Sequence, residues 1–90
     1  MTTFTELLRR AEQSEQYWVS GAQIEFSLKI ADIMQEDKLN QKQLAEILEV
    51  SPAYLSKLLA GKENLTLNTM ILYAQKLGRV FSFDLKKVVF

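Results

Sequence analysis

The chain contains neither cysteine nor histidine among its 90 residues. Disulfide bonds, thiolate nucleophiles and the two commonest transition-metal ligands are therefore unavailable to it. It also lacks a glycine-rich phosphate loop of the Gly-x-x-x-x-Gly-Lys kind. We therefore expect no enzyme activity, no cofactor and no metal site.

Long apolar runs are missing as well. No stretch approaches the ~18 apolar residues that a membrane-spanning helix needs, and the first residues have neither a basic start nor an apolar signal segment. The composition, with 48% hydrophobic and 24% charged residues, is typical of a globular domain. We therefore expect a cytoplasmic protein with no membrane partner.

The chain has no net charge, because 11 basic residues balance 11 acidic ones. The distribution is uneven. Residues 1–37 contain three basic and seven acidic residues. Residues 38–63 contain four basic and three acidic residues, and residues 64–90 contain four basic residues and one acidic residue. Contacts with DNA phosphates need a local basic face rather than a basic total, so this pattern permits DNA binding. The neutral sum predicts modest non-specific affinity.

Few helix breakers interrupt the chain, which has one proline and three glycines. The pattern predicts a short helix over about residues 3–14 and a break at Gly21. Over residues 22–37 the apolar residues alternate as in a strand, but charged residues at steps of three and four favour a central helix. Tyr17 and Trp18 are expected to belong to the core.

Two short segments then follow, each with a complete helix-start signal. Asn40 is the expected N-cap of the first, and Gln43 is placed to reach back to the cap backbone. Ser51 is the expected cap of the second, where Pro52 occupies the first helical position and Gly61 the end. Two crossing helices joined by a short turn are therefore predicted.

The end of the chain changes its period. A further helix over about residues 68–77 precedes an alternation of Phe81, Phe83 and Leu85 with polar residues, which is typical of a half-buried β-strand. A lone strand cannot satisfy its own backbone donors and acceptors. We therefore expect it to pair with its equivalent in a second copy and form a homodimer.

The segment LNQKQLAEILEVSPAYLSKLLAGK (residues 39–62) resembles the helix-turn-helix of the XRE family, the lambda-repressor-like proteins. The following ENLTLNTMILYAQKLG resembles the next helix of that family. One departure is Glu49, at a turn position where the family usually has a glycine with positive φ. The resemblance implies an all-α, lambda-repressor-like domain of about five helices with a C-terminal β-strand.

The resemblance also implies a division of the chain into three parts. Residues 1–21 would be an N-terminal helical extension, residues 22–78 the helix-turn-helix DNA-binding domain, and residues 79–90 the dimerisation strand.

The same resemblance implies a set of residues that contact double-stranded DNA. They lie at the start of the first helix of the motif, on the outer face of the second, and in the loop after it. The set is Asn40, Gln41, Ser51, Pro52, Ala53, Tyr54, Ser56, Lys57, Lys62 and Asn64. Ala53 suits a thymine methyl group and Lys57 a guanine or a phosphate. Because Pro52 and Ala53 donate few hydrogen bonds, part of the recognition is expected to rest on DNA shape.

Three functions stay open at this point. The first is a transcriptional repressor that binds a palindromic operator as a homodimer. The second is an antitoxin of the HigA-like subgroup, whose acidic first third would suit a basic toxin. The third is a protein-binding module without DNA affinity.

Overall fold

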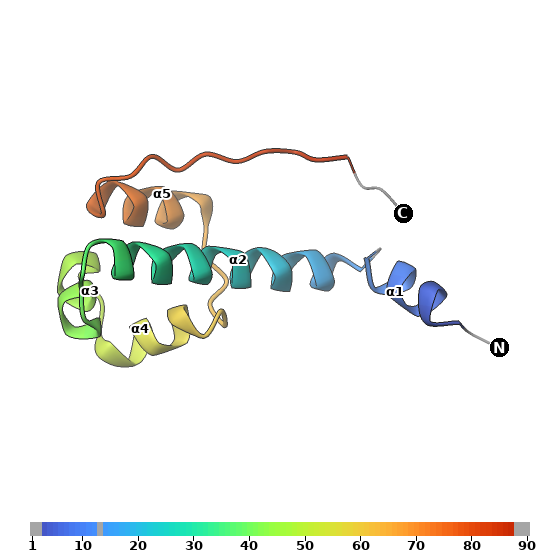
Figure 1. The fold of residues 1–90 in the computed structure, drawn as a ribbon, viewed down its shortest axis with the longest axis horizontal. Helices are drawn as coiled ribbons and strands as arrows, with labels where there is room; N and C mark the ends of the chain where they lie inside the picture. Colours follow the sequence, from blue (N-terminus) through green and yellow to red (C-terminus); the bar gives the residue numbers. More distant parts are fainter. Residues whose placement is uncertain (1–2, 13, 88–90) are drawn as a thin grey trace.

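Five α-helices and no β-strand make up the part of the chain that the computed structural model describes, residues 3–12 and 14–87 (Figure 1). They are α1 (Phe4–Glu12), α2 (Glu15–Glu36), α3 (Gln41–Leu48), α4 (Pro52–Leu59) and α5 (Leu67–Lys76). The predicted all-α class with about five helices is confirmed.

The longest element is α2, whose 22 residues span about 33 Å. The helical interpretation of residues 22–37 is confirmed, but the predicted break at Gly21 is wrong, because α2 continues through it. A glycine within a helix costs only about 1 kcal/mol relative to alanine, which is too little to stop this one. Among the described helices, none is long and apolar enough to cross a membrane.

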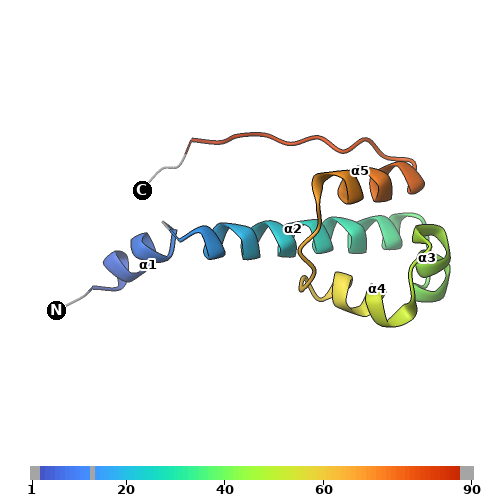
Figure 2. The ribbon, with the colours of Figure 1, turned by 180° about the vertical axis from the view of Figure 1, so that it is seen from behind.

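The hydrophobic core lies around the second half of α2. Figures 1 and 2 show α4 on one side of α2, α5 on the other, and α3 closing the end. The buried core residues are Ile30, Leu44, Ala45, Leu48, Leu55, Leu58, Tyr73 and Leu77. We call this unit, residues 26–79, the body of the molecule.

The first part of the chain extends away from the body. We call α1 and residues 15–25 of α2 the N-terminal arm, and it contributes to a long axis of 51 Å against 25 and 22 Å for the other two. Tyr17 and Trp18 lie in this arm with 41% and 49% of their surface exposed, so their expected place in the core is wrong. Their rings pack edge to face, with centroids 5.2 Å apart.

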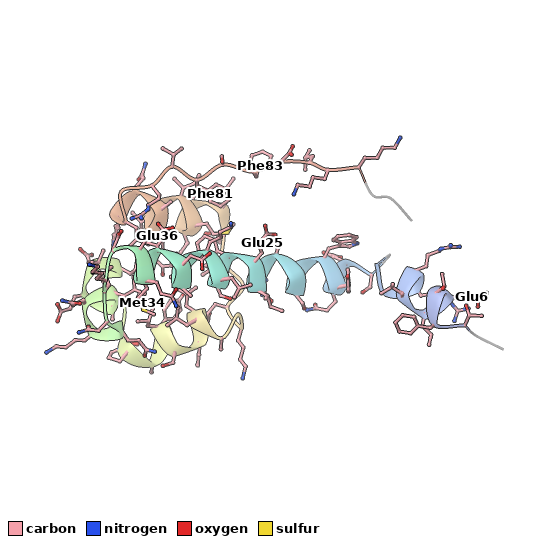
Figure 3. All side chains as sticks on the ribbon, in the orientation of Figure 1. Glu6, Glu25, Met34, Glu36, Phe81 and Phe83 are labelled. Carbon is pink, nitrogen blue, oxygen red and sulfur yellow. The ribbon has the colours of Figure 1, made fainter. Side chains whose placement is uncertain are left out.

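The predicted C-terminal strand is wrong for the part of it that the structure describes. Residues 79–87 run past α5 as an extended tail (Figures 1 and 3) without a β-ladder. Phe81 is half-buried, whereas Phe83 and Leu85 are 75% and 88% exposed. The alternation is present in the sequence, but no second strand lies within the described residues to pair with it. Residues 88–90 lie outside those residues.

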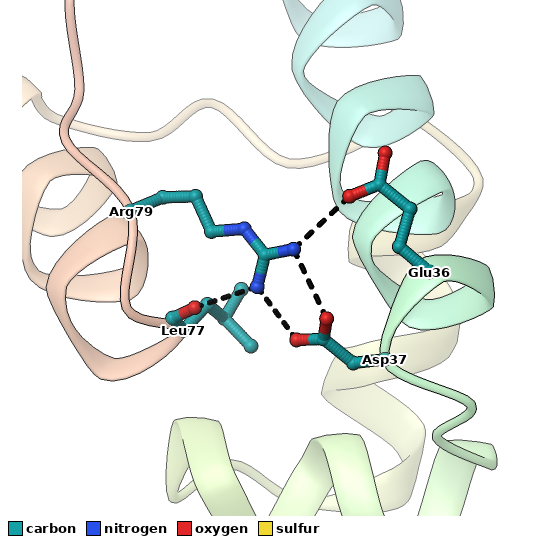
Figure 4. Close-up of polar contacts among 4 residues, drawn as sticks. All are labelled: Glu36, Asp37, Leu77 and Arg79. Carbon is teal, nitrogen blue, oxygen red and sulfur yellow. Dashed lines mark hydrogen bonds and ion pairs between the residues drawn. The ribbon is translucent and has the colours of Figure 1, made fainter.

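The ends of two helices of the body, α2 and α5, are joined to the tail where the tail begins. Arg79 donates two hydrogen bonds to Asp37, of 2.6 and 3.0 Å, and one of 3.0 Å to Glu36 (Figure 4). It also donates to the carbonyl oxygen of Leu77 at 2.8 Å. The guanidinium group lowers the pKa of Asp37 through the hydrogen bonds and its charge. The direction in which the tail leaves α5 is therefore tied to the end of α2.

The division into residues 1–21, 22–78 and 79–90 remains a prediction. Its first boundary falls inside α2, which is continuous there.

Candidate nucleic-acid interface

The start of α3 is fixed by a capping box. The Asn40 side-chain oxygen accepts a hydrogen bond from the Gln43 backbone N–H at 2.8 Å, and the Gln43 side-chain oxygen accepts one from the Asn40 N–H at 2.9 Å. This confirms the predicted helix start. Asn40 and Gln41 are exposed, and the first backbone N–H groups of a helix attract anions such as phosphate.

The turn between α3 and α4 is held in a left-handed conformation. Glu49 has φ 59° and ψ 44°, as the family position requires, which costs a non-glycine residue about 1 kcal/mol or more. Lys76 of α5 offsets part of this cost. Its Nζ lies 3.3 Å from the Glu49 carboxylate and donates to the Leu48 carbonyl oxygen at 3.3 Å. The turn is therefore fastened to α5.

The start of α4 is fixed by Ser51 and Pro52. The Ser51 hydroxyl oxygen accepts a hydrogen bond from the Tyr54 N–H at 3.1 Å, and Pro52 takes the first helical position. The predicted cap is confirmed. Because the cap uses the hydroxyl only as an acceptor, its proton can still be donated to a phosphate.

The two faces of α4 differ sharply. Leu55 and Leu58 point into the core and are 1% and 2% exposed. The opposite face is exposed and carries the candidates Pro52, Ala53, Ser56 and Lys57. Their spacing of one, three and one residues places them side by side on a helix. The outer face of α4 is therefore narrow, made of small side chains, and carries one positive charge.

Tyr54 points a different way from its neighbours. It is half-buried and packs against the core, and its hydroxyl is hydrogen-bonded with Tyr73 of α5. Burial first, and then this hydrogen bond, raise the pKa of Tyr54 to about 12. The hydroxyl already has a partner inside the molecule, so the geometry favours a structural role for Tyr54 over a phosphate contact.

The end of α4 lies against α2 through a glycine. Gly61 has φ +71°, and a Cβ atom there would lie 3.2–3.3 Å from Ile24 and Ser27, including the Ile24 Cα. A side chain at this position would meet both a strained backbone conformation and the α2 backbone. The close approach leaves Lys62 and Asn64 exposed in the loop that follows.

Nine of the ten predicted contact residues are exposed, and Tyr54 is the exception. The structure brings four of them together on α4, with Ser51 at its start and Lys62 and Asn64 beyond its end. Asn40 and Gln41 stand apart, at the start of α3. The prediction missed Lys42, which is exposed at the second position of α3. Its place beside the capped helix start was the signal that could have identified it.

Residues 30–80 match the model of a helix-turn-helix family, HTH_3. The match covers more than half of the chain and includes α3, α4, the turn between them and α5. No curated protein and no solved structure matches the chain.

Proposed function

The chain belongs to the HTH_3 family of helix-turn-helix domains, the XRE or lambda-repressor-like type, which bind DNA sequence-specifically, and we propose that it is a transcriptional repressor. It acts as a homodimer on a palindromic operator. Each copy inserts the outer face of α4 into the major groove. Occupation of a promoter by the dimer excludes RNA polymerase.

The contacts divide into those that position the protein and those that read sequence. Asn40 and Gln41 at the start of α3, and Lys62 and Asn64 after α4, suit DNA phosphates. On α4 itself, Ala53 suits a thymine methyl and Lys57 a guanine or a phosphate. With so few hydrogen-bond donors on this face, sequence-dependent DNA shape contributes to specificity.

One observation carries the proposal: the face of α4 opposite Leu55 and Leu58 is exposed along its length. The ion pairs of the described residues leave the lysines of this face unused. Lys76 is paired with Glu49, and Arg79 with Glu36 and Asp37, whereas Lys57 and Lys62 belong to none of these pairs. Both lysines are exposed and available to phosphate, although Glu63 adds one negative charge beside Lys62.

Selection of bound sequences from a pool of random DNA duplexes tests this function. We expect an inverted repeat, and binding that weakens steeply as salt concentration rises. Lys57→Ala should weaken binding about 10-fold, since one contact of this kind is worth about 1–3 kcal/mol. Lys29→Ala is the matched control, because Lys29 is an exposed lysine on α2, outside the interface. Absence of salt-dependent binding to any duplex would contradict the proposal and favour a protein-binding module.

The acidity of the first third of the chain favours a second candidate, an antitoxin that neutralises a basic toxin and regulates its own promoter. Residues 1–37 carry seven acidic and three basic residues. The discriminating experiment expresses the product of the adjacent gene alone and together with this chain. Growth arrest that the chain relieves supports the antitoxin, and normal growth in both cases supports the repressor.

A further inference from the structure

The turn between α3 and α4 is built on a glutamate in a conformation that favours glycine. Glu49 has φ 59° and ψ 44°. Its N–H donates to the carbonyl oxygen of Glu46 at 3.2 Å, and the N–H of Val50 donates to that of Ala45 at 3.0 Å, which is the hydrogen-bond pattern of a Schellman motif. Ser51 caps α4 only two residues after Glu49. The conformation of Glu49 therefore sets the angle at which α4 leaves α3.

The last carbonyl group of α3 finds its partner on α5. The residue four positions after Leu48 is Pro52, which has no N–H, so the Leu48 carbonyl oxygen cannot receive the usual helical hydrogen bond. Lys76 Nζ donates to this oxygen at 3.3 Å and lies 3.3 Å from the Glu49 carboxylate. A positive charge is favourable at the C-terminus of a helix. One ammonium group therefore serves two adjacent residues of the turn.

The surroundings of Lys76 hold its side chain in place. It lies in the last turn of α5, between the core residues Tyr73 and Leu77, and its side chain is 23% exposed against 78% for Glu49. Salt screens such a sheltered ammonium group less than a fully exposed one. Because α5 and α4 lie on opposite sides of α2 (Figure 1), this contact connects α5 to the turn that carries α4.

We propose that Lys76 and Glu49 are positioning residues for DNA recognition. Their ion pair, together with the hydrogen bond to Leu48, holds the α3–α4 turn so that α4 keeps the orientation in which it enters the major groove. Neither side chain contacts DNA. This inference rests on the DNA-binding function proposed above, and it extends the residues that determine affinity beyond the helix-turn-helix to α5.

The sign of a Glu49 substitution separates this role from overall electrostatics. Removal of a negative charge close to DNA should by charge alone strengthen binding. Loss of the ion pair should instead weaken it, because α4 spends less time in the binding orientation. A chain that holds this orientation for about one third of the time binds about 3-fold more weakly. We expect a loss of this size for Glu49→Gln.

Matched glutamate substitutions make this comparison direct. Binding is measured by fluorescence anisotropy with the inverted-repeat duplex recovered from the random pool, at a temperature at which circular dichroism shows every variant to be folded. Glu46→Gln is the control, because Glu46 is exposed on α3 and belongs to none of the ion pairs of the described residues. It should bind as tightly as the wild type or more tightly. Glu49→Gly removes the same charge as Glu49→Gln but accepts the left-handed conformation, so it should bind within about 2-fold of the wild type.

The salt dependence of binding separates positioning from direct contact. Lys76→Met should weaken binding about 10-fold, because it removes a hydrogen bond from a charged donor as well as the ion pair. The slope of log affinity against log salt concentration should stay unchanged. Lys57→Ala, which removes a proposed DNA contact, should lower that slope by about 1 if the contact is to phosphate. A reduced slope for Lys76→Met would indicate a phosphate contact and overturn the positioning role.

Two further results separate this inference from the proposed function. A Glu49→Gln chain that binds as tightly as Glu46→Gln overturns the inference and leaves DNA binding intact. A wild-type chain that binds no duplex refutes the proposed function, and amide hydrogen exchange then decides the inference. The N–H groups of Val50 and Tyr54, both hydrogen-bonded at the turn, should exchange faster in Lys76→Met than in the wild type, relative to core amides. Unchanged exchange at both groups would overturn the inference.

Discussion

The body and the N-terminal arm use the same kind of apolar spacing with opposite outcomes. In the body, Leu44 and Leu48 of α3 are 0% and 1% exposed, whereas Phe4 and Leu7 in the arm are 79% and 54% exposed. Both sets recur at steps of three and four residues along a helix. Periodicity therefore identifies the face that has to be buried, but not whether the covering surface lies in the same chain.

Local helix signals are present in both regions. In the body, Asn40, Ser51 and Thr66 each accept a hydrogen bond from a backbone N–H three residues later. At the start of α1, Thr3 accepts one of the same kind from Glu6 at 3.2 Å, whereas Ser14 at the start of α2 accepts none. The two regions therefore differ mainly in burial, because the core residues all lie in the body.

The largest expected difference between the body and the arm is in the stability lost when a leucine is replaced by alanine. Leu44→Ala, in the body, should lower the free energy of unfolding by about 2–5 kcal/mol, because it removes fully buried methyl groups and leaves a cavity. Leu7→Ala, in the arm, should change it by less than about 0.5 kcal/mol when the chain is monomeric. Urea denaturation of both variants, at a concentration at which the chain is monomeric, checks this. Equal losses would mean that the arm is part of the core.

A pair of glycine substitutions tests how closely the end of α4 packs against α2. Gly61 and Gly78 both have positive φ, of 71° and 70°, but only Gly61 approaches another element. Gly78→Ala should cost about 1 kcal/mol from the left-handed conformation alone. Gly61→Ala should cost about 1–3 kcal/mol more, because its Cβ meets the α2 backbone. Similar melting temperatures for the two variants would contradict the close contact.

Removing the Tyr54 hydroxyl should have a smaller effect on stability, and it separates a structural role of this residue from a role in DNA binding. Tyr54→Phe should lower stability by about 1 kcal/mol through loss of the hydrogen bond with Tyr73, and leave DNA affinity unchanged. The pKa of Tyr54 is raised from 10.0 to about 12, so the unfolded phenol loses its proton first. The stabilisation is therefore lost as pH rises from about 10 to 12, and Tyr54→Phe should remove that loss. A 10-fold drop in DNA affinity would instead indicate a phosphate contact.

The smallest effect is expected at the join between α2 and the tail. Arg79→Gln should lower the melting temperature slightly at neutral pH, and less at high salt, because the ion pairs are exposed and screened. The pKa of Asp37 is lowered in the folded chain, so its contribution is present above pH 4 and lost as pH falls through the lowered value. The variant should accordingly show a flatter acid dependence. An identical pH profile for both chains would exclude this role.

Much of the body could be predicted from sequence because its signals are local. The caps at Asn40 and Ser51 bring together residues three apart, and the charge spacing of α2 is a property of one helix. The exposed contact set followed from the same motif. The bond between Arg79 and Asp37 could not be predicted, since it joins residues 42 apart, and neither could the inward turn of Tyr54, whose partner Tyr73 is on another helix.

The wrong predictions have two causes. The break at Gly21 overestimated the helix-breaking effect of one glycine, which costs only about 1 kcal/mol. The core position for Tyr17 and the paired strand after Arg79 each assumed a neighbouring element that the described residues do not supply. Composition and spacing describe the segment alone, so they could not say that α2 continues past the body or that the tail finds no second strand among the described residues.

The Gly61 contact has a consequence for operator architecture. A Cβ atom on this glycine would lie 3.2–3.3 Å from one main-chain atom and two side-chain atoms of α2, so the end of α4 lies closer to α2 than a residue with a Cβ ordinarily allows. The distance between α4 and α2 is therefore fixed within each copy, and the surface that joins two copies also sets the spacing of their α4 helices. We expect an operator with one base pair inserted at its centre to bind more weakly, because the insertion rotates one half-site by about 34° relative to the other.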